Sequence, residues 1–335
     1  MNRRWLLLLL LIALALLAWL LYQRSSPSTL AGPLSDFAVA DTAAVDRIFI
    51  ADLQGRTIDL RRAGDGWTVN GMKAKAFDVR LLLKTFKRVE VRSPVPKSQE
   101  STVLRVMAAS SRRVEIYQGG REPEKIWIIG HGTKDHFGTY ALLEKPGKGR
   151  SSVPFILGMS GFTGILDPRF HTDLDLWRSS EMFRYEDLYD LASVELEFPG
   201  VPRSSYRIEN LPEGKVRMTD LQGKELPFDS VLVRGALLPY QALNYEYIER
   251  NLSEHAKDSL LATTPDQVLR VTERDGDRRN VKFWYMPNKS EVSQWDPQKL
   301  HDEVRMRALM DDTLLVVVQR QMFDRVIQPA HTLIR

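Results

Sequence analysis

The sequence predicts an α+β protein with mainly antiparallel sheets and a few helices, preceded by a single transmembrane helix. Three observations lead to this fold class. Short segments alternate apolar and polar residues between glycine-containing turns, as half-buried strands do. Three longer stretches have the apolar spacing of a helix, and they separate groups of strands rather than alternating with single strands. Near its start the chain carries an uncharged apolar run from Trp5 to Tyr22.

The apolar run has the length of a membrane-spanning helix. Its 18 residues would span roughly 27 Å, close to the ~30 Å hydrocarbon core of a bilayer. A cleaved signal peptide is the alternative, but the nearest small-x-small sequence, Ala38-Val39-Ala40, lies too far beyond the run to be presented at the membrane surface. Arg3 and Arg4 precede the run, so the positive-inside tendency places the N-terminus in the cytoplasm. We therefore expect a single-pass protein of the inner (cell) membrane, embedded in the lipid bilayer through residues 5–22, with a periplasmic or extracellular C-terminal domain.

Composition excludes several classes of function. The chain has no cysteine, which rules out disulfides, cysteine metal sites, thiol catalysis and attachment of lipid to a cysteine. The formal net charge is only +4, with acids and bases both numerous, and this argues against nucleic acid as a partner. No P-loop, no HExxH helix and no strand-linked GxGxxG is present, so no cofactor is expected.

The chain divides into four predicted parts. Residues 1–22 form the cytoplasmic tip and the anchor, and residues 23–44, rich in Ser, Pro, Gly and Ala, form a flexible tether. Residues 45–190 form a first α+β unit, and residues 191–335 form a second one with a C-terminal helix and strand.

The two units begin with a similar order of elements, which predicts a duplicated ββ-β-α unit. The strands expected before each helix are 45–50, 57–60 and 67–71 in the first unit, and 194–198, 205–208 and 215–219 in the second. A Phe-Asp pair opens each helix, at Phe77 and at Phe228. The tetrapeptide Asp-Leu-Gln-Gly also occurs twice, from Asp52 and from Asp220, but at different points of the two units. Because turns draw on few residue types, we interpret it as turn chemistry used twice.

The helices are predicted from their caps and their apolar spacing. In the first helix Phe77 is the expected hydrophobic staple and Asp78 the N-cap, and Pro94 and Pro96 end it. Its inner side would carry Leu81, Leu82, Thr85, Phe86 and Val89. The second helical stretch runs from Asp229 to about Leu252, and the third from Pro297 to Met310.

The remaining segments are predicted strands. They cover residues 113–117, 125–129, 138–143, 153–157, 268–273 and 281–285, and the apolar run 314–318, which suits a strand buried on both faces.

Several of these motifs resemble a known family. The opening of the resemblance lies in Ile48-Phe49-Ile50, Gly55, Ile58, Leu60 and Gly66-Trp67-Thr68-Val69-Asn70-Gly71. Its centre lies in Tyr140, Pro154-Phe155, Gly161-Phe162, Gly164, Leu166, Arg169-Phe170 and Trp177-Arg178, and its tail in Gln319, Phe323 and Asp324. Together they resemble a bacterial family of membrane-anchored domains of unknown function (the 4340-type domain). Some relatives in that family are encoded beside ABC-type transport components linked to gliding motility, which implies an accessory role in the cell envelope and no catalytic residues.

Two polar loops are candidate sites. His131 and His136, with Asp135 between them, offer three ligand types that suit zinc, although their spacing matches no established site and a polar connection between strands explains them as well. His171, Asp173 and Asp175 offer a general acid/base pair or calcium ligands. The alternative for this second loop is a surface turn held by buried Phe170 and Trp177.

Two further motifs have both a functional and a structural interpretation. Ser160 lies in Gly158-Met159-Ser160-Gly161-Phe162, which lacks the last glycine of a serine-hydrolase elbow, so we expect a loop serine. A patch of basic residues on the first helix, Arg80, Lys84, Lys87 and Arg88, would lie on one flank and contact either lipid headgroups or an acidic partner. The alternative is an ordinary solvated helix face.

These observations favour a non-enzymatic, membrane-anchored accessory or scaffold protein that binds other envelope proteins, with a link to transport or gliding implied by the resemblance. The first alternative is an extracytoplasmic hydrolase or ligand-binding protein that uses His171, Asp173 and Asp175, or His131 and His136. The second is a glycan-binding module, which would expose Trp177, Trp284 or Trp295 along a shallow groove.

Overall fold

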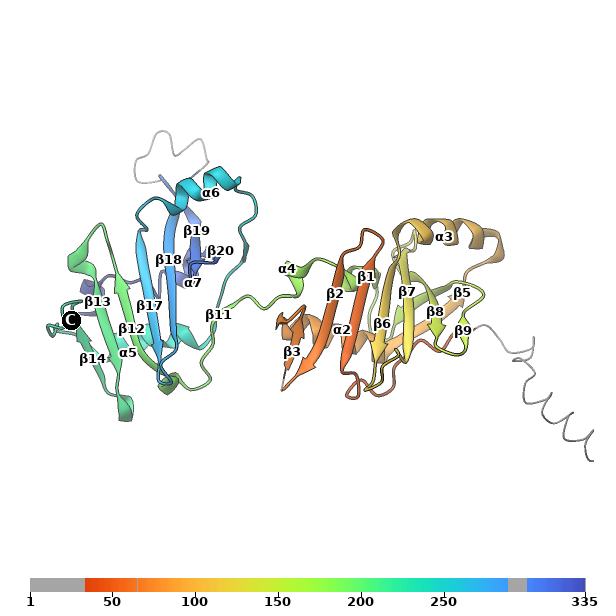
Figure 1. The fold of residues 1–335 in the computed structure, drawn as a ribbon, viewed down its shortest axis with the longest axis horizontal. Helices are drawn as coiled ribbons and strands as arrows, with labels where there is room; N and C mark the ends of the chain where they lie inside the picture. The colour runs from red at the N-terminus through yellow and green to blue at the C-terminus, as the bar shows by residue number, and fades with distance from the viewer. Residues whose placement is uncertain (1–33, 65, 289–299, 335) are drawn as a thin grey trace, which may run out of the picture. The chain divides into compact units, whose positions relative to one another are not determined.

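The structure, a computed structural model, describes residues 34–64, 66–288 and 300–334. The chain forms two compact units, the first ending at Trp177 and the second beginning at Arg178 (Figure 1). The sequence had placed this boundary between residues 190 and 191. Met182, Phe183 and Tyr185 lie before that point, but they are buried in the core of unit 2, which moves the boundary upstream.

Unit 1 is built on a 10-stranded antiparallel sheet. Its strands are β1 (Arg47–Asp52), β2 (Thr57–Ala63), β3 (Gly66–Val69), β4 (Met72–Lys73), β5 (Val89–Pro94), β6 (Arg112–Tyr117), β7 (Lys125–Gly132), β8 (Thr139–Lys145), β9 (Gly149–Arg150) and β10 (Phe155–Met159). They lie in the order β4-β3-β2-β1-β6-β7-β8-β10-β5, with β9 paired to β8. Helices α2 (Ala76–Arg88), α3 (Lys97–Ser110) and α4 (Leu174–Trp177), with the 3₁₀ turn η1 (Asp167–Phe170), complete the unit.

Helix α2 seals the apolar face of this sheet. Phe86 of α2 packs edge-on against Trp127 of β7, with 5.1 Å between the ring centroids, and both side chains are fully buried. Phe170 of η1 packs against the same indole at 6.2 Å. Alternate residues of the central strands, such as Ile48 and Ile50 of β1, face this core because side chains on a strand alternate between its two faces.

Helix α3 covers part of the opposite face. Val103 and Met107 of α3 pack on Ile126 and Ile128 of β7, and these residues form a smaller, separate core. The sequence pattern does not predict this helix. The predicted start of α2 is also wrong: the helix begins at Ala76, Asp78 lies within its first turn rather than at the N-cap, and Phe77 is 61% exposed and cannot act as a staple.

Residues 34–44, which the sequence predicts as part of the tether, pack against unit 1. Phe37 is 1% exposed and lies 5.7 Å from Trp127 between ring centroids. Val39 N donates to Phe86 O at 2.9 Å. Buried Lys125 donates to the backbone oxygens of Asp36 and Ala38, and it also pairs with the Asp36 carboxylate at 3.2 Å. Residues 34–44 are therefore part of the folded unit, whereas the predicted anchor at residues 5–22 lies outside the described residues.

Unit 2 is built on an 8-stranded antiparallel sheet. Its strands are β12 (Leu191–Glu197), β13 (Tyr206–Asn210), β14 (Val216–Thr219), β16 (Tyr247–Ile248), β17 (Gln267–Glu273), β18 (Arg278–Pro287), β19 (His301–Met310) and β20 (Leu314–Gln319). Two short strands, β11 (Glu181–Phe183) and β15 (Leu243–Asn244), pair separately. The helices are α5 (Ser230–Leu237), α6 (Glu254–Leu261) and α7 (Arg320–Phe323), with short 3₁₀ turns η2 (Leu188–Asp190), η3 (Pro202–Ser204), η4 (Pro212–Gly214), η5 (Leu238–Gln241) and η8 (Ala330–Leu333).

The two sheets have the same strand order. Across unit 2 the order is β14-β13-β12-β17-β18-β19-β20-β16, and eight strands of unit 1 follow as β3-β2-β1-β6-β7-β8-β10-β5. Helix α5 takes the place of α2 along the chain, and α6 takes the place of α3. The α+β prediction with mainly antiparallel sheets and few helices is confirmed.

Two helical predictions in unit 2 are wrong. Residues 301–310, expected in a helix from Pro297, form strand β19, where Met306, Ala308 and Met310 enter the core at every second position. Pairing with both β18 and β20 overrides the helical propensity of this segment. The apolar stretch from Asp229 continues as a helix only to Leu237, although Asp229 is indeed its N-cap and accepts from Val231 N and Leu232 N.

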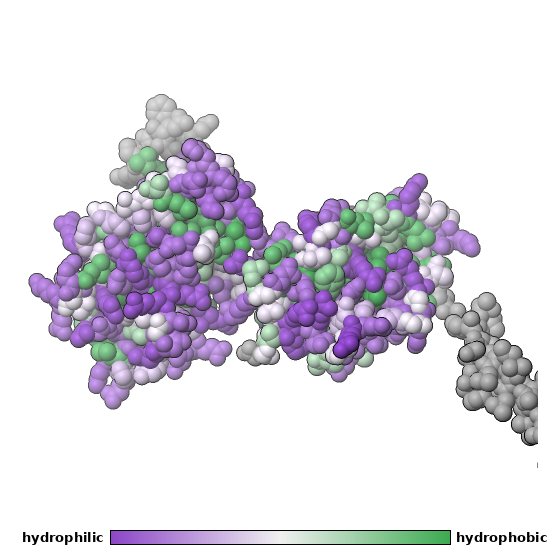
Figure 2. All heavy atoms as spheres, in the orientation of Figure 1, coloured by the Kyte–Doolittle hydropathy of each residue, from purple (hydrophilic) through white to green (hydrophobic). Residues whose placement is uncertain are grey.

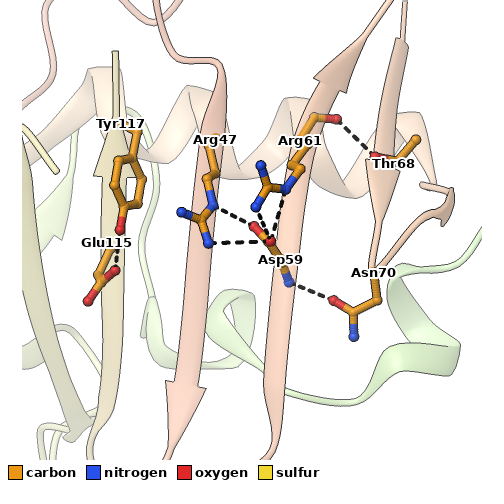
Figure 3. A network of polar contacts seen from close by, with 7 residues as sticks. All are labelled: Arg47, Asp59, Arg61, Thr68, Asn70, Glu115 and Tyr117. Atoms are coloured by element: carbon orange, nitrogen blue, oxygen red, sulfur yellow. Dashed lines mark hydrogen bonds and ion pairs between the residues drawn. The ribbon is translucent and has the colours of Figure 1, made fainter. Parts of the chain in front are cut away.

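The second face of each sheet carries paired charges. In unit 1, Asp59 on β2 binds Arg47 on β1 and Arg61 on its own strand, both at 2.8 Å (Figure 3). In unit 2, Arg270 on β17 binds Glu195 and Glu197 on β12, at 2.6 and 2.8 Å. The view of Figure 2 shows this strand face of unit 2 as mainly hydrophilic. Because much of this second face is charged, it needs no second full layer, and in unit 1 α3 covers only the part around Ile126 and Ile128.

Within the part of the chain that the structure describes, no helix has both the length and the apolarity needed to cross a membrane.

We predict that Phe86→Ala destabilises the protein by about 3–5 kcal/mol, because it empties the space against Trp127 at the centre of the core. Phe77→Ala on the same helix should change stability by less than about 0.5 kcal/mol, since this side chain is exposed. Urea unfolding followed by tryptophan fluorescence measures both variants. Equal losses would contradict the orientation of α2.

Candidate functional site

The glycines around His131 and His136 are explained by close packing. A Cβ on Gly130 would lie 2.7 Å from Met107 of α3, and one on Gly138 would lie 2.4 Å from Ile156 of β10. A Cβ on Gly132 would lie 2.5 Å from Ile165. The glycine-rich motif therefore lets neighbouring elements approach the sheet.

Asp135 and Thr133 bind within the loop. Asp135 accepts hydrogen bonds from Thr133 Oγ1 and from Phe137 N, and the bond from Thr133 is the main reason that the pKa of Asp135 is lowered. His131 packs on Tyr140, with 5.0 Å between ring centroids, whereas His136 is exposed and has a φ of 60°. Among the described residues no cluster of three metal-ligating side chains forms, in this loop or elsewhere.

The second candidate loop is a packed turn. His171 stacks on Trp177 at 4.8 Å between centroids, and Trp177 Nε1 donates to His171 O at 2.9 Å. Asp173 Oδ1 accepts from Asp175 N at 3.0 Å and so opens the short helix α4. Phe170 and Trp177 are 0% and 1% exposed, as the packed-turn interpretation required.

Burial changes the chemistry of His171. Loss of contact with water lowers the pKa of its imidazole, which nearby Asp173 and Asp78 only partly offset. Its Nδ1 atom is buried and has no hydrogen-bond partner among the described residues. The neutral ring serves as a packing surface for the indole.

The most perturbed carboxylate of unit 1 was missed from the sequence. The Asp52 side chain, 5% exposed, accepts from Thr172 Oγ1 at 2.6 Å, from Arg56 Nε at 2.7 Å and from two backbone amides of its own turn. Burial alone would raise the pKa of Asp52, but these hydrogen bonds outweigh it and lower the pKa to about 2. Asp52 thereby joins the β1–β2 turn to the segment that carries His171.

Asp220, in the second copy of Asp-Leu-Gln-Gly, caps its own turn in the same way. It accepts from Gln222 N at 3.0 Å and from Lys224 N at 2.8 Å, as Asp52 does from Gln54 N and Arg56 N. The shared tetrapeptide is therefore a turn sequence, used at two different places in the two sheets.

The other motifs also have structural roles. Ser160 is exposed after β10, and its amide donates to Arg88 O at 3.1 Å; a loop follows where a hydrolase elbow needs a helix. Trp177 and Trp284 are buried and line no groove, while Trp295 lies outside the described residues. Tyr240 and Tyr245 are core residues of unit 2.

The basic patch is exposed as expected. Arg80, Lys84, Lys87 and Arg88 all lie on the outer side of α2, around exposed Phe77. For these four side chains the described part of the chain provides no ion pair.

An apolar stripe on unit 2 was not anticipated. Val231 and Leu238, separated by two turns of helical chain, are 68% and 57% exposed on the outside of α5 and η5, with Gly235 between them. Beside them lies an open hollow of about 450 Å³ lined by Gly235, Leu238, Pro239, Gln241, Ala242, Met322, Arg325 and Gln328. The sequence shows a continuous apolar stretch here, which does not separate exposed positions from core positions.

A second hollow is polar. It measures about 420 Å³ and lies in unit 1 between the β6–β7 turn and the end of β8, where Glu122, Glu124, Lys145 and Lys148 line it. Neither hollow includes a histidine or any residue of the two predicted polar loops.

No family model matches the chain, and no curated protein or solved structure is significantly similar to it. The resemblance to the membrane-anchored domain family stays a prediction. Its central motif residues have packing roles: Leu166, Phe170 and Trp177 are buried, and Arg169 lies over the Phe162 ring at 4.3 Å and donates to Thr85 Oγ1 at 2.7 Å.

We predict that unit 1 loses stability as the pH falls below 6.5, the ordinary pKa of histidine, toward the lowered pKa of His171. In that window the unfolded chain binds a proton that the folded chain excludes, so the free energy of unfolding rises with pH. His171→Gln should remove this slope. Urea titrations at several pH values measure it, and an unchanged slope in the variant would contradict the assignment.

We predict that Asp52→Asn costs about 1–3 kcal/mol at neutral pH, because it breaks a buried set of hydrogen bonds to a charged group. The lowered pKa means that this contribution is complete above the ordinary value of 3.8 and is lost as the pH falls toward about 2. The difference between wild type and variant should therefore shrink on acidification, which denaturant titration measures. A difference that stays constant down to that pH would rule out the carboxylate as its source.

Proposed function

We propose that the chain is a single-span, membrane-anchored, extracytoplasmic accessory or scaffold protein that binds another envelope protein. The uncharged run of residues 5–22 and the arginines before it support the anchor and its orientation. The resemblance supports an association with transport or gliding components. In the part of the chain that the structure describes, the histidines and aspartates of the candidate loops are engaged in turns and packing, and this favours the scaffold over the hydrolase.

We also propose that the two units are copies of one ββ-β-α design and that a transmembrane helix precedes them in the chain. Their shared strand order supports this, and so does the register. Ile48 pairs with Leu60 and Ile116 in unit 1, and Val194 pairs with Ile208 and Val271 at the matching place in unit 2. All six side chains are buried under the covering helix.

The apolar stripe on unit 2 carries the scaffold proposal. Val231 and Leu238 are large apolar side chains held outward on a short rigid helix and the turn after it, and the hollow beside them has an apolar floor with Gln241, Arg325 and Gln328. An apolar centre with a polar margin is typical of protein–protein interfaces. The occupant we propose is an apolar segment of one envelope protein.

A photocrosslinking residue placed at Leu238 or Met322 in the full chain should capture one and the same envelope protein, and the same residue at exposed Leu53 of unit 1 should not. Mass spectrometry of the membrane fraction identifies the adduct.

Gly235→Glu should abolish this adduct, because it places a charge in the stripe. The position tolerates the change: a Cβ there meets nothing within 4 Å. Gly200→Glu in the same unit, also in open space, is the matched control and should leave the adduct intact. Equal adducts from Leu53, or an adduct that survives Gly235→Glu, would overturn the proposal.

A further inference from the structure

The outer faces of the two covering helices differ sharply in chemistry. On α2 the exposed residues other than Ala76 are Phe77, Arg80, Lys84, Lys87 and Arg88, a set we call the cationic face. At 100° per residue these five side chains fall within one sector of the helix, opposite buried Val79 and Phe86. The corresponding helix α5 has a single basic residue, Arg234, and an apolar stripe instead. Both helices cover the apolar face of their sheet, so the packing of the core does not require the cationic face.

Intramolecular pairing does not account for these charges. Elsewhere in unit 1, two arginines on the sheet, Arg47 and Arg61, are matched with the carboxylate of Asp59. The acid of α2 itself, Asp78, pairs with Lys75 at 3.4 Å, at the start of the helix and off the cationic face. In the described structure, four positive charges without ion pairs therefore surround an exposed phenyl ring. This combination suits an anionic surface with an apolar layer beneath it.

The chain enters unit 1 on the same side as α2. Val39 N bonds to Phe86 O in the last turns of the helix, and Phe37 fills the core between α2 and the sheet. The Asp36 carboxylate is held by Lys125 at 3.2 Å and by Lys145 at 2.7 Å, which fixes this entry point. Leu34, the first described residue of this connection, is partly buried against the same core that α2 covers.

The connection is too short to let unit 1 move far from the bilayer. Residues 23–33 separate the apolar run from Leu34, and 11 residues reach about 40 Å when fully extended. That distance is about the width of a domain of this size. An anchored unit 1 therefore stays within roughly one diameter of the lipid surface, and the first described residues of the connection pack on the α2 side of the sheet.

We infer that the cationic face of α2 docks on the anionic headgroups of the membrane in which the chain is anchored, with Phe77 inserted among them. This inference rests on the proposed function, because it uses the anchor. The interaction fixes the orientation of unit 1 on the bilayer. Unit 1, which follows the predicted anchor in the chain, then binds lipid, and unit 2 binds protein through its apolar stripe.

The absence of cysteine allows a clean test on the full chain. Ala76→Cys, exposed beside Phe77, and Val106→Cys, 38% exposed on α3, are each labelled with an environment-sensitive fluorophore. The proteins are placed in nanodiscs of phosphatidylcholine with or without phosphatidylglycerol, which also contain headgroup spin-labelled lipid as a quencher. We expect quenching at position 76 in the anionic discs only, none at position 106, and release by molar salt.

Replacing Arg80, Lys84, Lys87 and Arg88 by Gln together should abolish the quenching at position 76. The matched control removes four exposed positive charges outside α2, with Lys97→Gln, Arg105→Gln, Lys134→Gln and Lys148→Gln, and should keep the quenching. Equal quenching at positions 76 and 106, or quenching that survives the α2 replacements, overturns the inference.

Retention in the discs tests the anchor separately. If the protein co-elutes with neutral discs in molar salt but shows no quenching at position 76 in anionic discs, the anchor is supported and the lipid face is refuted. If the protein binds only anionic discs and dissociates from them in molar salt, the lipid face is supported and the anchor is refuted.

Discussion

The need to cover one apolar face of a wide antiparallel sheet determines most of this structure. In unit 1 the cover is α2, whose Phe86 lies on Trp127, and in unit 2 it is α5, whose Val233 and Leu237 enter the core. Charged pairs on the opposite face, such as Arg270 with Glu195, remove the need for a second full layer there. Because packing constrains only the inner side of such a helix, the residues on its outer side can vary. The two units differ most clearly on the outer sides of α2 and α5.

The strands were predictable because their signal is local. Alternation along β1 and β12, and continuous burial along β20, appear directly in the sequence, and each predicted strand has a counterpart in the structure. Helices were harder. α3 buries only Val103 and Met107, too few positions to give an apolar period, and β19 combines good helix formers with core positions at every second residue. Its conformation is decided by β18 and β20, which the segment itself does not reveal.

The packing roles of the candidate loops could not be read from the sequence for a related reason. A glycine that fits a ligand and a glycine that fits a neighbouring side chain have the same sequence signature, and Gly130 and Gly138 belong to the second kind. His171 attracted a catalytic interpretation, yet its ring packs on an indole only six residues away. Asp52 is bound by Thr172, which lies far along the chain, so no spacing rule could have found it. The basic residues of α2 were identified because helical spacing alone brings them together.

The proposed duplication gives a physical reason for the proposed separation of roles between the units. When one core design occurs twice, each copy must keep its inward-facing pattern, and substitutions on the exposed side of the covering helix cost little stability. Opposite chemistries can then accumulate on equivalent surfaces: positive charge around Phe77 in the copy nearer the predicted anchor, and apolar side chains around Gly235 in the other. A single unit has one such covering helix and could not present both surfaces on it. If the covering helix of the first copy is docked on lipid, that helix cannot also bind a protein. The second copy of the fold then provides the contact with protein.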